Sequence, residues 1–253
     1  MTTPEKRLTG RIARERIRSL SVPRLPDGTV ERFKALGDCA GIVSDVMDEL
    51  GIPAGVIGAS VLRPTMPGTV MVGPALTIRN TVQRANPLDG AKTKTSKMAE
   101  FEGHNLATSG DVMVIQGVPG MSNMGGISAL TGKRQGEIGA IVEGGVRDIP
   151  HQREVGYPVW STEVTPVTGK WRLETVEING DIEICGVRVS CGDLVIADDT
   201  GVCFVPRASI TAVLEGAEKK AKAEAIRCKA IADGMPVPDI AKPDAAIPQG
   251  KSK

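Results

Sequence analysis

An arginine and an aspartate stand side by side at the end of an apolar run, in the segment Gly144-Gly145-Val146-Arg147-Asp148. The guanidinium of Arg147 can hold a carboxylate through two parallel hydrogen bonds. The carboxylate of Asp148 can ligate Mg²⁺ or Mn²⁺, with water molecules completing the coordination shell. The pair therefore predicts a site for a metal ion and an anionic substrate. The alternative is a surface ion pair that caps a turn.

A glycine-rich loop at residues 117–126 is the second candidate. Its glycines leave backbone N–H groups free just before a predicted helix, and free amides at the positive end of a helix attract a carboxylate or phosphate. The loop has neither the GxGxxG fingerprint of dinucleotide-binding folds nor the GK[ST] of a phosphate-binding loop. A ligand-binding loop and an ordinary turn both remain open for this segment.

The other reactive residue types limit the chemistry. His104 and His151 are the two histidines, so a Ser-His-Asp triad would need one of them, and no GxSxG motif accompanies either. The five cysteines form no CxxC pair, which argues against a disulfide framework or a zinc knuckle. Any metal would be a hard ion held by carboxylates and water. The carboxylates of Asp198 and Asp199 are better explained by a turn.

The region that carries both candidates is predicted to form a parallel sheet. Residues 111–117, 140–145 and 157–162 are predicted strands, with a helix over 127–136 and a short helix after Asp148. This β-α-β-α-β order builds parallel strands with right-handed crossovers. Ligands of such sheets bind beyond the carboxyl ends of the strands, which is where the loop and the Arg147-Asp148 pair lie.

The flanking regions complete an α/β fold. The segment after residue 163 has short strands with turn signals and is predicted to be β-rich and antiparallel. Residues 5–20 are predicted to form a basic amphipathic helix, an arm that could reach a neighbouring subunit. Further predicted elements are two helices over 29–51, three short strands in GVIGASVLRP, GTVMVG and PALTIRN, a helical stretch over 88–107 and a helix over 207–233. We divide the chain into an N-terminal arm and linker (1–28), an α/β core (29–206) and a C-terminal helix and tail (207–253).

Composition narrows the class of protein. Among the 253 residues, 31 Lys and Arg balance 30 Asp and Glu, which argues against a nucleic-acid binder. The few aromatic residues, three Phe, one Tyr and two Trp, offer little for base stacking. No apolar run reaches the length of about 18 residues needed to span a membrane, and the polar start argues against a signal peptide. The prediction is a cytoplasmic protein without nucleic-acid or membrane partners.

Five segments together resemble one known family: GDVMVIQG, GGIS at 125–128, AIVEGGVRD at 140–148, GYPVW and CGDLVIADDTGVCFVP at 191–206. They are similar to the 4-hydroxy-4-methyl-2-oxoglutarate/4-carboxy-4-hydroxy-2-oxoadipate aldolases, whose superfamily also contains the regulators of ribonuclease activity A (RraA). The resemblance covers about residues 35–230. It implies an α/β/β/α swivelling-type sandwich, assembled as homotrimers or homohexamers with active sites between subunits.

The resemblance also implies roles for individual residues. The aldolases are class II enzymes that need a divalent metal and act on pyruvate-type 2-oxo acids. By position, Asp148 matches their metal ligand and Arg147 their substrate-binding arginine. An acid from the adjacent subunit's early helix matches Asp45, and another from the C-terminal helix matches Glu224. The amide cradle for the pyruvyl group matches four consecutive residues, Gly125, Gly126, Ile127 and Ser128.

One departure from the family concerns the cradle. Its second position is acidic in the aldolases, where it orients a water molecule, but it is Gly126 here. The predicted function is a Mg²⁺- or Mn²⁺-dependent lyase that cleaves a 4-hydroxy-2-oxo acid to pyruvate or decarboxylates oxaloacetate. The alternatives are a non-catalytic RraA-like interaction protein and a related lyase or hydratase acting on a sugar-acid derivative. The ribonuclease regulators typically lack the metal-ligating aspartate, so the Arg147-Asp148 pair favours an enzyme.

Overall fold

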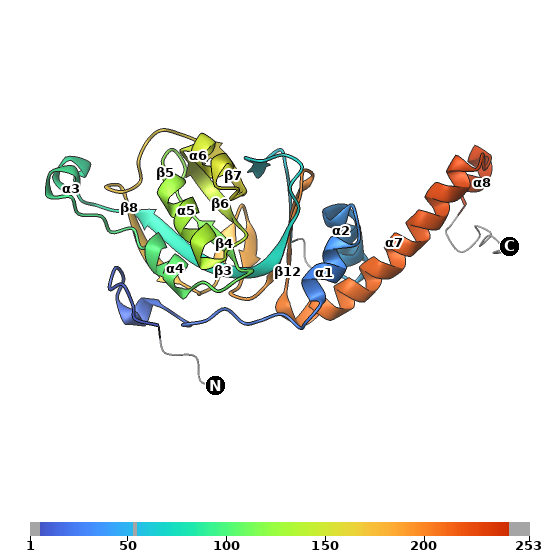
Figure 1. The fold of residues 1–253 in the computed structure, drawn as a ribbon, viewed down its shortest axis with the longest axis horizontal. Helices are drawn as coiled ribbons and strands as arrows, with labels where there is room; N and C mark the ends of the chain where they lie inside the picture. Colours follow the sequence, from blue (N-terminus) through green and yellow to red (C-terminus); the bar gives the residue numbers. More distant parts are fainter. Residues whose placement is uncertain (1–5, 53–54, 243–253) are drawn as a thin grey trace.

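The computed structural model describes residues 6–52 and 55–242, and Figure 1 shows its ribbon. Within these residues, ten strands form one large mixed sheet and two more form a separate hairpin. No helix among them is long and apolar enough to cross a membrane.

The parallel part of the sheet confirms the predicted β-α-β-α-β unit. Four strands lie side by side and parallel, in the order β3, β4, β6, β7, and β5 pairs with the end of β6. Helices α5 and α6 connect β5 to β6 and β6 to β7. The bounds are β3 (Met71–Val82), β4 (Val112–Gln116), β5 (Ser122–Met124), α5 (Gly126–Gln135), β6 (Gly139–Val146), α6 (Ile149–Glu154) and β7 (Val159–Val164).

The remaining strands pair antiparallel, as predicted for the second half of the chain. Strands β11, β12 and β1 extend the sheet from one end of β3, while β8 pairs with its other end and β2 with β7. Strands β9 and β10 form the separate hairpin. The bounds are β1 (Val56–Gly58), β2 (Arg63–Pro64), β8 (Leu173–Ile178), β9 (Ile182–Ile184), β10 (Val187–Val189), β11 (Leu194–Ala197) and β12 (Gly201–Val205).

The prediction of separate strands in GTVMVG and PALTIRN was wrong, because the second half of the first segment and all of the second belong to one twelve-residue strand, β3. Pro74 lies where this strand changes partner: residues 71–74 pair with β11 and residues 75–79 with β4. Proline has no N–H to donate, so it is tolerated at a position where the strand passes from one hydrogen-bonded partner strand to another. Strand β3 thereby links the antiparallel and parallel parts of the sheet.

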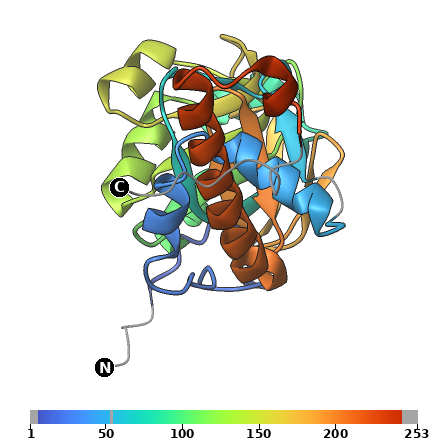
Figure 2. The same cartoon turned by 90° about the vertical axis from the view of Figure 1, so that its right-hand side faces the viewer.

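Three hydrophobic clusters separate the layers of an α/β/β/α sandwich, as predicted. One lies between α4, α5 and the parallel strands, and another lies between the two halves of the folded sheet. The third packs α1, α2 and the first turns of α7 against β11 and β12. Figure 2 views the molecule from the α7 side. The helices are α1 (Thr29–Lys34), α2 (Cys39–Glu49), α3 (Pro87–Thr93), α4 (Glu100–Leu106), α7 (Ile210–Ala232) and α8 (Val237–Ile240), with 3₁₀ turns at Arg14–Arg16 and Arg207–Ser209.

The predicted basic helix over residues 5–20 was wrong. Among the described residues of this arm, only the 3₁₀ turn at Arg14–Arg16 is helical, and Gly10 has a φ of 74° that interrupts a helix. Ile12 and Ile17 instead insert into the core of the same chain, and the backbone N–H of Arg18 donates to the carbonyl of Ile178. The arm therefore lies extended across its own chain.

Two further regions differ from the prediction. The helical stretch over 88–107 is two short helices, α3 and α4, separated by residues 94–99. The helix predicted over 207–233 is present as α7, but its second half extends away from the body (Figure 1), and its buried residues all lie between Ile210 and Ala217. The Pro-rich tail contains the short α8, and the part beyond residue 242 lies outside the described residues.

Candidate functional site

The glycine-rich loop is held in shape by one buried side chain. The side-chain oxygen of Asn123 accepts a hydrogen bond from the backbone N–H of Val118 at 3.1 Å, and its amide group donates to the carbonyls of Val118 and Met121. Gly117 is required here, because a Cβ would lie 2.2 Å from the carbonyl oxygen of Glu143. These contacts fix the conformation of the loop that leads to the start of α5.

The structure brings the predicted Arg147-Asp148 pair to the start of α5. The backbone N–H of Gly126 donates to Oδ2 of Asp148 at 2.9 Å, and Nε of Arg147 lies 3.5 Å from the same oxygen. Asp148 has a φ of 59°, a left-handed conformation that few non-glycine residues adopt and that concentrates at functional sites. The loop and the pair thus form one site at the carboxyl ends of β5 and β6.

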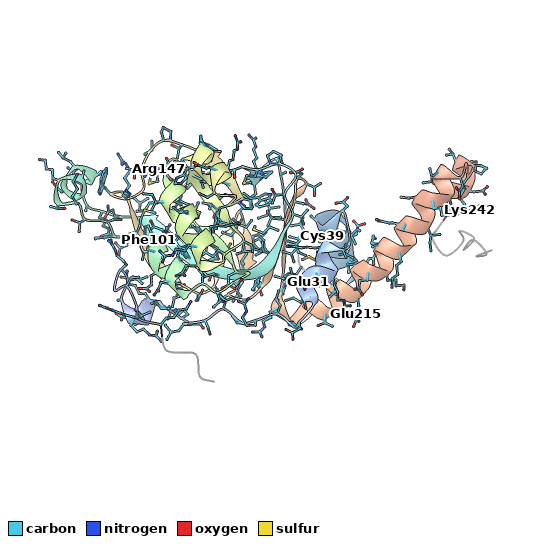
Figure 3. All side chains as sticks on the ribbon, in the orientation of Figure 1. Glu31, Cys39, Phe101, Arg147, Glu215 and Lys242 are labelled. Atoms are coloured by element: carbon cyan, nitrogen blue, oxygen red, sulfur yellow. The ribbon has the colours of Figure 1, made fainter. Side chains whose placement is uncertain are left out.

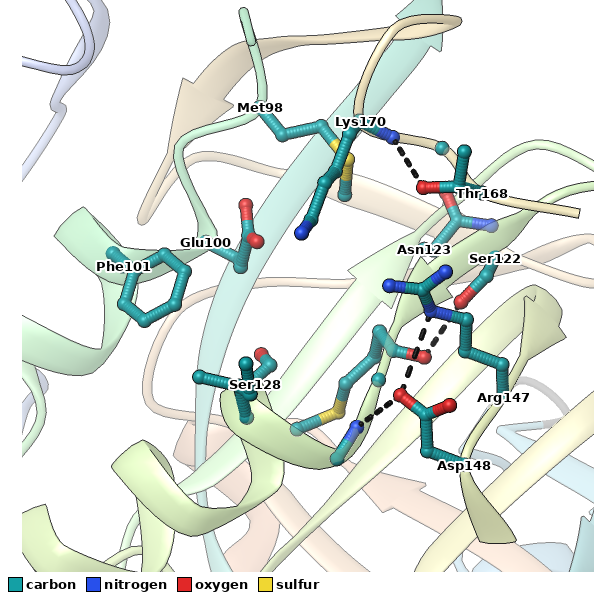
Figure 4. Close-up of a pocket in the computed structure, with 15 residues that line it drawn as sticks. Met98, Glu100, Phe101, Ser122, Asn123, Ser128, Arg147, Asp148, Thr168 and Lys170 are labelled. Carbon is teal, nitrogen blue, oxygen red and sulfur yellow. Dashed lines mark hydrogen bonds and ion pairs between the residues drawn. The ribbon is translucent and has the colours of Figure 1, made fainter. Parts of the chain in front are cut away.

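These residues line an open pocket (Figure 4). Arg147 and Asp148 lie on one side of it, while Glu100, Phe101 and Ser128 lie on the other. Among the described residues, the terminal guanidinium nitrogens of Arg147 have no hydrogen-bond partner, so both are free to bind a carboxylate. The full lining is Met98, Glu100, Phe101, Ser122, Asn123, Met124, Gly125, Gly126, Ile127, Ser128, Arg147, Asp148, Thr168, Gly169 and Lys170.

A hard divalent cation fits the donor set that Asp148 offers. One carboxylate oxygen is used by Gly126, but the other has no partner among the described residues, and the side chain is 46% exposed. Mg²⁺ is commonly held by one or two carboxylates together with water and substrate oxygens. No group of three or more His, Cys, Asp or Glu side chains suited to a metal occurs in the described part of the chain.

Glu100 is a pocket residue that the sequence analysis missed. It starts α4, its Oε2 is buried without a hydrogen-bond partner among the described residues, and its side chain lines the pocket opposite Arg147. Burial raises the pKa of this carboxyl group above its ordinary value, opposed first by a hydrogen bond with its own backbone and then by nearby positive charges that include Arg11 and Lys170. No sequence signal marks Glu100, because its burial depends on how α4 packs against α5.

Replacing Glu100 with glutamine should stabilise the fold at neutral pH. The pKa of Glu100 is higher in the folded chain than in the unfolded chain. Between the two pKa values the folded chain therefore binds more protons, and the free energy of unfolding falls as pH rises through that range. Glutamine removes this loss, so we expect Tm to rise by a few degrees at pH 7–8, about 2–4 °C per kcal/mol. The gain should shrink as pH falls toward 4. Calorimetry against pH measures this, with the exposed Glu154→Gln as control; an equal gain at all pH values would contradict it.

Two predicted residues are not part of this pocket within one chain. Asp45 on α2 and Glu224 on α7 belong to elements at the opposite end of the molecule from Arg147 (Figures 1 and 3). Asp45 instead lies 3.1 Å from Nζ of Lys220, which also pairs with Glu49. Glu224 is exposed on the projecting part of α7. Within one chain, Arg147, Asp148 and the cradle therefore lie together, whereas Asp45 and Glu224 lie far from them.

Other carboxylates behave as the sequence analysis expected. Asp198 accepts hydrogen bonds from the backbone N–H groups of Thr200 and Ala40, which makes it a turn residue. Asp199 accepts from the backbone N–H of Gly68.

Comparison with known proteins decides the family. The model of the RraA-like family, described as Aldolase/RraA, matches residues 41–204. The chain belongs to the RraA-like family. It is 30% identical over 178 residues to a putative 4-hydroxy-4-methyl-2-oxoglutarate aldolase from Halalkalibacterium halodurans. The aligned segment covers 70% of this chain and 79% of the relative. Protein DlpA of Legionella pneumophila is 29% identical over 172 residues, which are 65% of this chain but only 25% of DlpA.

Solved structures show the same fold. A Streptomyces coelicolor protein, RraAS2, described as an unusual member of the RNase ES inhibitor RraA family, is 27% identical with a TM-score of 0.66, over 80% of this chain and 96% of that one. An uncharacterized protein from Pseudomonas syringae has a TM-score of 0.71 at 21% identity, over 87% of this chain and 100% of its own. The RraA-like assignment thus holds for both sequence and fold.

The structure explains why this RraA-like chain has glycine at position 126. A Cβ on Gly126 would lie 2.4 Å from Nδ1 and 3.0 Å from Cβ of His151, on α6. The imidazole ring of His151 therefore occupies the space that a side chain at position 126 would need. Restoring an acid at this position requires the ring to move.

We expect Gly126→Asp to destabilise the chain by about 1–3 kcal/mol, the usual cost of overpacking. Because the clash is with His151, adding His151→Ala should recover most of that loss, although His151→Ala alone should have a small effect. Denaturant unfolding of the two single variants and the double variant measures the coupling. Strictly additive free energies would show that His151 does not fill the position-126 space.

Proposed function

We propose that this chain is a divalent-metal-dependent lyase that releases pyruvate from a 4-hydroxy-2-oxo acid or decarboxylates oxaloacetate. One observation carries the proposal: Arg147, Asp148 and the free amides at the start of α5 converge on one pocket. The relative named as a putative 4-hydroxy-4-methyl-2-oxoglutarate aldolase supports the same reaction class. That the protein works in the cytoplasm stays a prediction from its sequence.

The chain's own groups would bind and orient the substrate. Arg147 would hold the carboxylate with its two terminal nitrogens, because planar guanidinium and carboxylate groups match. The backbone N–H groups of Ile127 and Ser128, in the first turn of α5, would face the same end of the substrate. Asp148 would hold the metal, which when bound polarises the 2-oxo group and stabilises developing negative charge.

A carboxylate at the far end of the substrate would have its own cation. Lys170 lines the pocket, and its ammonium group makes no hydrogen bond or ion pair within 4 Å among the described residues, although its charge acts on the carboxyl group of Glu100 (Figure 4). Two cations, Arg147 and Lys170, suit a substrate with a carboxylate at each end better than one with a single acid group. We therefore include 2-oxo dicarboxylates in the proposed substrate class.

We propose further that the site is completed by a second copy of the chain, in a homotrimer or homohexamer. Asp45 and Glu224 lie far from Arg147 within one chain, and the projecting half of α7 exposes Ile226 and Ile231. These two side chains, on an otherwise charged helix, offer a small apolar surface that a second copy could cover. The two acids would then reach a neighbour's pocket.

Replacing Glu224 with glutamine tests this arrangement. If Glu224 completes a neighbour's site, we expect kcat/KM to fall by about tenfold or more, since removal of one catalytic carboxylate typically costs at least 1.4 kcal/mol. Size-exclusion chromatography with light scattering should show an unchanged oligomer. Glu215→Gln, an exposed change nearer the body on the same helix, should leave the activity intact. A fully active Glu224→Gln variant would remove this residue from the site.

The deciding experiment measures pyruvate release from oxaloacetate and from 4-hydroxy-4-methyl-2-oxoglutarate, with and without Mg²⁺ or Mn²⁺. Metal-dependent release above the spontaneous rate supports the lyase. Binding of metal and 2-oxo acids without release would indicate different chemistry, such as hydration of a sugar-acid derivative. No binding at all would favour the non-catalytic interaction protein, the function that the name of the ribonuclease-inhibitor relatives suggests.

A further inference from the structure

Behind the pocket, four buried side chains form a continuous line of hydrogen bonds. Ser128 Oγ lies 2.7 Å from His104 Nε2, and His104 Nδ1 lies 2.8 Å from Glu137 Oε1. The hydroxyl of Tyr157 donates to the other oxygen of Glu137 at 2.6 Å. None of the four residues is more than 4% exposed. They come from α4, from α5, from the loop that follows α5 and from the loop before β7.

The partners at both ends set the direction of the hydrogen bonds. Burial and the neighbouring Glu137 carboxylate raise the pKa of Tyr157 well above its ordinary value, so the phenol keeps its proton and donates it. A carboxylate group can only accept, so Nδ1 of His104 donates to Glu137, and in the tautomer with that single ring proton Nε2 is the acceptor for the Ser128 hydroxyl. A hydroxyl, an imidazole and a carboxylate in this order form the arrangement that activates a hydroxyl group.

Only one end of this line reaches a ligand-accessible surface. Ser128 lines the pocket that contains Arg147 and Asp148, whereas His104, Glu137 and Tyr157 are enclosed. The backbone is fitted to the network, because a Cβ on Gly132 would lie 2.4 Å from Glu137 Oε2. Buried polar networks cost free energy that an apolar core would avoid. A purely structural network has no need to end at a pocket.

We propose that Ser128, His104 and Glu137 form a proton relay that serves the substrate in this pocket, an inference that rests on the proposed lyase function. The C4 hydroxyl of the substrate gives its proton to Ser128 Oγ while Ser128 gives its own to His104 Nε2. The electrons of that O–H bond form a carbonyl as the C3–C4 bond breaks, and the pair from C3–C4 forms the enolate of pyruvate. The imidazolium of His104, balanced by Glu137, then returns the proton through Ser128 to C3.

The relay supplies what the cradle lacks. Gly126 carries no carboxyl group and its side-chain space is filled by His151, so no acid can act from that position. Ser128 stands two residues further along the same helix and faces the pocket. Ser128 is the catalytic residue of this proposal, while His104 and Glu137 are positioning residues that act through it.

The test uses two measurements on the full chain with Mg²⁺ or Mn²⁺. One is cleavage of the 4-hydroxy-2-oxo acid, and the other is exchange of the methyl protons of pyruvate in D₂O, followed by NMR. Exchange requires proton transfer at C3 but no C–C cleavage. For Ser128→Ala we expect kcat and the exchange rate to fall by about a hundredfold or more, the usual size of an acid–base contribution. KM should stay near the wild-type value, whereas Tm should fall modestly, because Nε2 of the buried His104 loses its hydroxyl partner.

Thr131→Ala is the matched control, because it also removes a hydroxyl from α5, one that donates to the carbonyl of Ile127 and does not line the pocket. Glu137→Gln separates a relay from a packing role. A relay acts as a unit, so the double variant Ser128→Ala/Glu137→Gln should be no slower than the worse single variant. Losses that multiply would overturn the relay.

The two measurements also separate this proposal from the lyase. Wild-type cleavage that Ser128→Ala retains would overturn the relay and leave the lyase standing. Exchange that depends on Ser128, without cleavage of any substrate, would support the relay and overturn the lyase. Absence of both activities in the wild-type protein would overturn both.

Discussion

Replacing Asp148 with asparagine is expected to abolish metal-dependent turnover while leaving the fold intact. The change removes the charge that would hold the metal, and a bound divalent cation stabilises the transition state by several kcal/mol. A loss of about 4 kcal/mol corresponds to about a thousandfold in kcat/KM. Asparagine is the appropriate substitution because it tolerates the φ of 59° at this position and its oxygen can still accept from Gly126. Turnover measured against Mn²⁺ concentration, together with Mn²⁺ binding by electron paramagnetic resonance, checks the prediction.

Asp148→Ala provides the comparison that separates metal binding from backbone geometry. Alanine should lose the same activity and also lower Tm, because it lacks the polar side chain that helps Asp and Asn adopt a left-handed conformation, which otherwise costs about 1–2 kcal/mol. Asp199→Asn is the control, since Asp199 only accepts from a turn amide away from the pocket. Full activity of Asp148→Asn at saturating metal would remove Asp148 from the metal site.

The candidate site was predictable where it depends on strand order. The β-α-β-α-β pattern predicts that residues after consecutive parallel strands meet at one edge, and the contact from Gly126 to Asp148 confirms this for the loop and the pair. The family resemblance then supplied the roles of Arg147 and Asp148, which stay predictions until they are measured. Local patterning and topology were sufficient for this half of the pocket.

The other half depends on contacts that the sequence does not reveal. Glu100 and His104 reach the site because α4 packs against α5, and His104 meets Glu137 across 33 positions of chain. The composition alone showed that a triad would need one of two histidines, but nothing pointed to Ser128 and Glu137 as its partners. Long-range side-chain geometry of this kind emerges from packing.

The N-terminal arm shows how a helical pattern can mislead. Apolar residues at positions 8, 12, 17 and 20 among basic ones suit an amphipathic helix, yet Ile12 and Ile17 insert into the core from an extended chain. Irregular spacing of three to five residues does not distinguish the two conformations. Contacts with the core decided the outcome, including the hydrogen bond from the backbone of Thr9 to the buried Glu102.

Replacing Arg147 with lysine should weaken substrate binding strongly without affecting the fold. The planar guanidinium can make two parallel hydrogen bonds to a carboxylate, whereas an ammonium acts as a point charge. Losing one charge-assisted hydrogen bond costs about 1.5–3 kcal/mol, so KM should rise by about tenfold to a hundredfold. Since this contact is made equally in the ground state and the transition state, kcat should change little.

A rescue experiment makes the role of Arg147 specific. Arg147→Ala should lose binding more completely than the lysine variant, and added guanidinium ion should restore part of it while added ammonium should not. Arg134→Lys, an exposed change on α5, should leave KM unchanged. A KM within twofold of wild type for Arg147→Lys would show that the substrate carboxylate is bound elsewhere. Lys170 would then be the first cation to test, because it is the other cation among the residues that line the pocket.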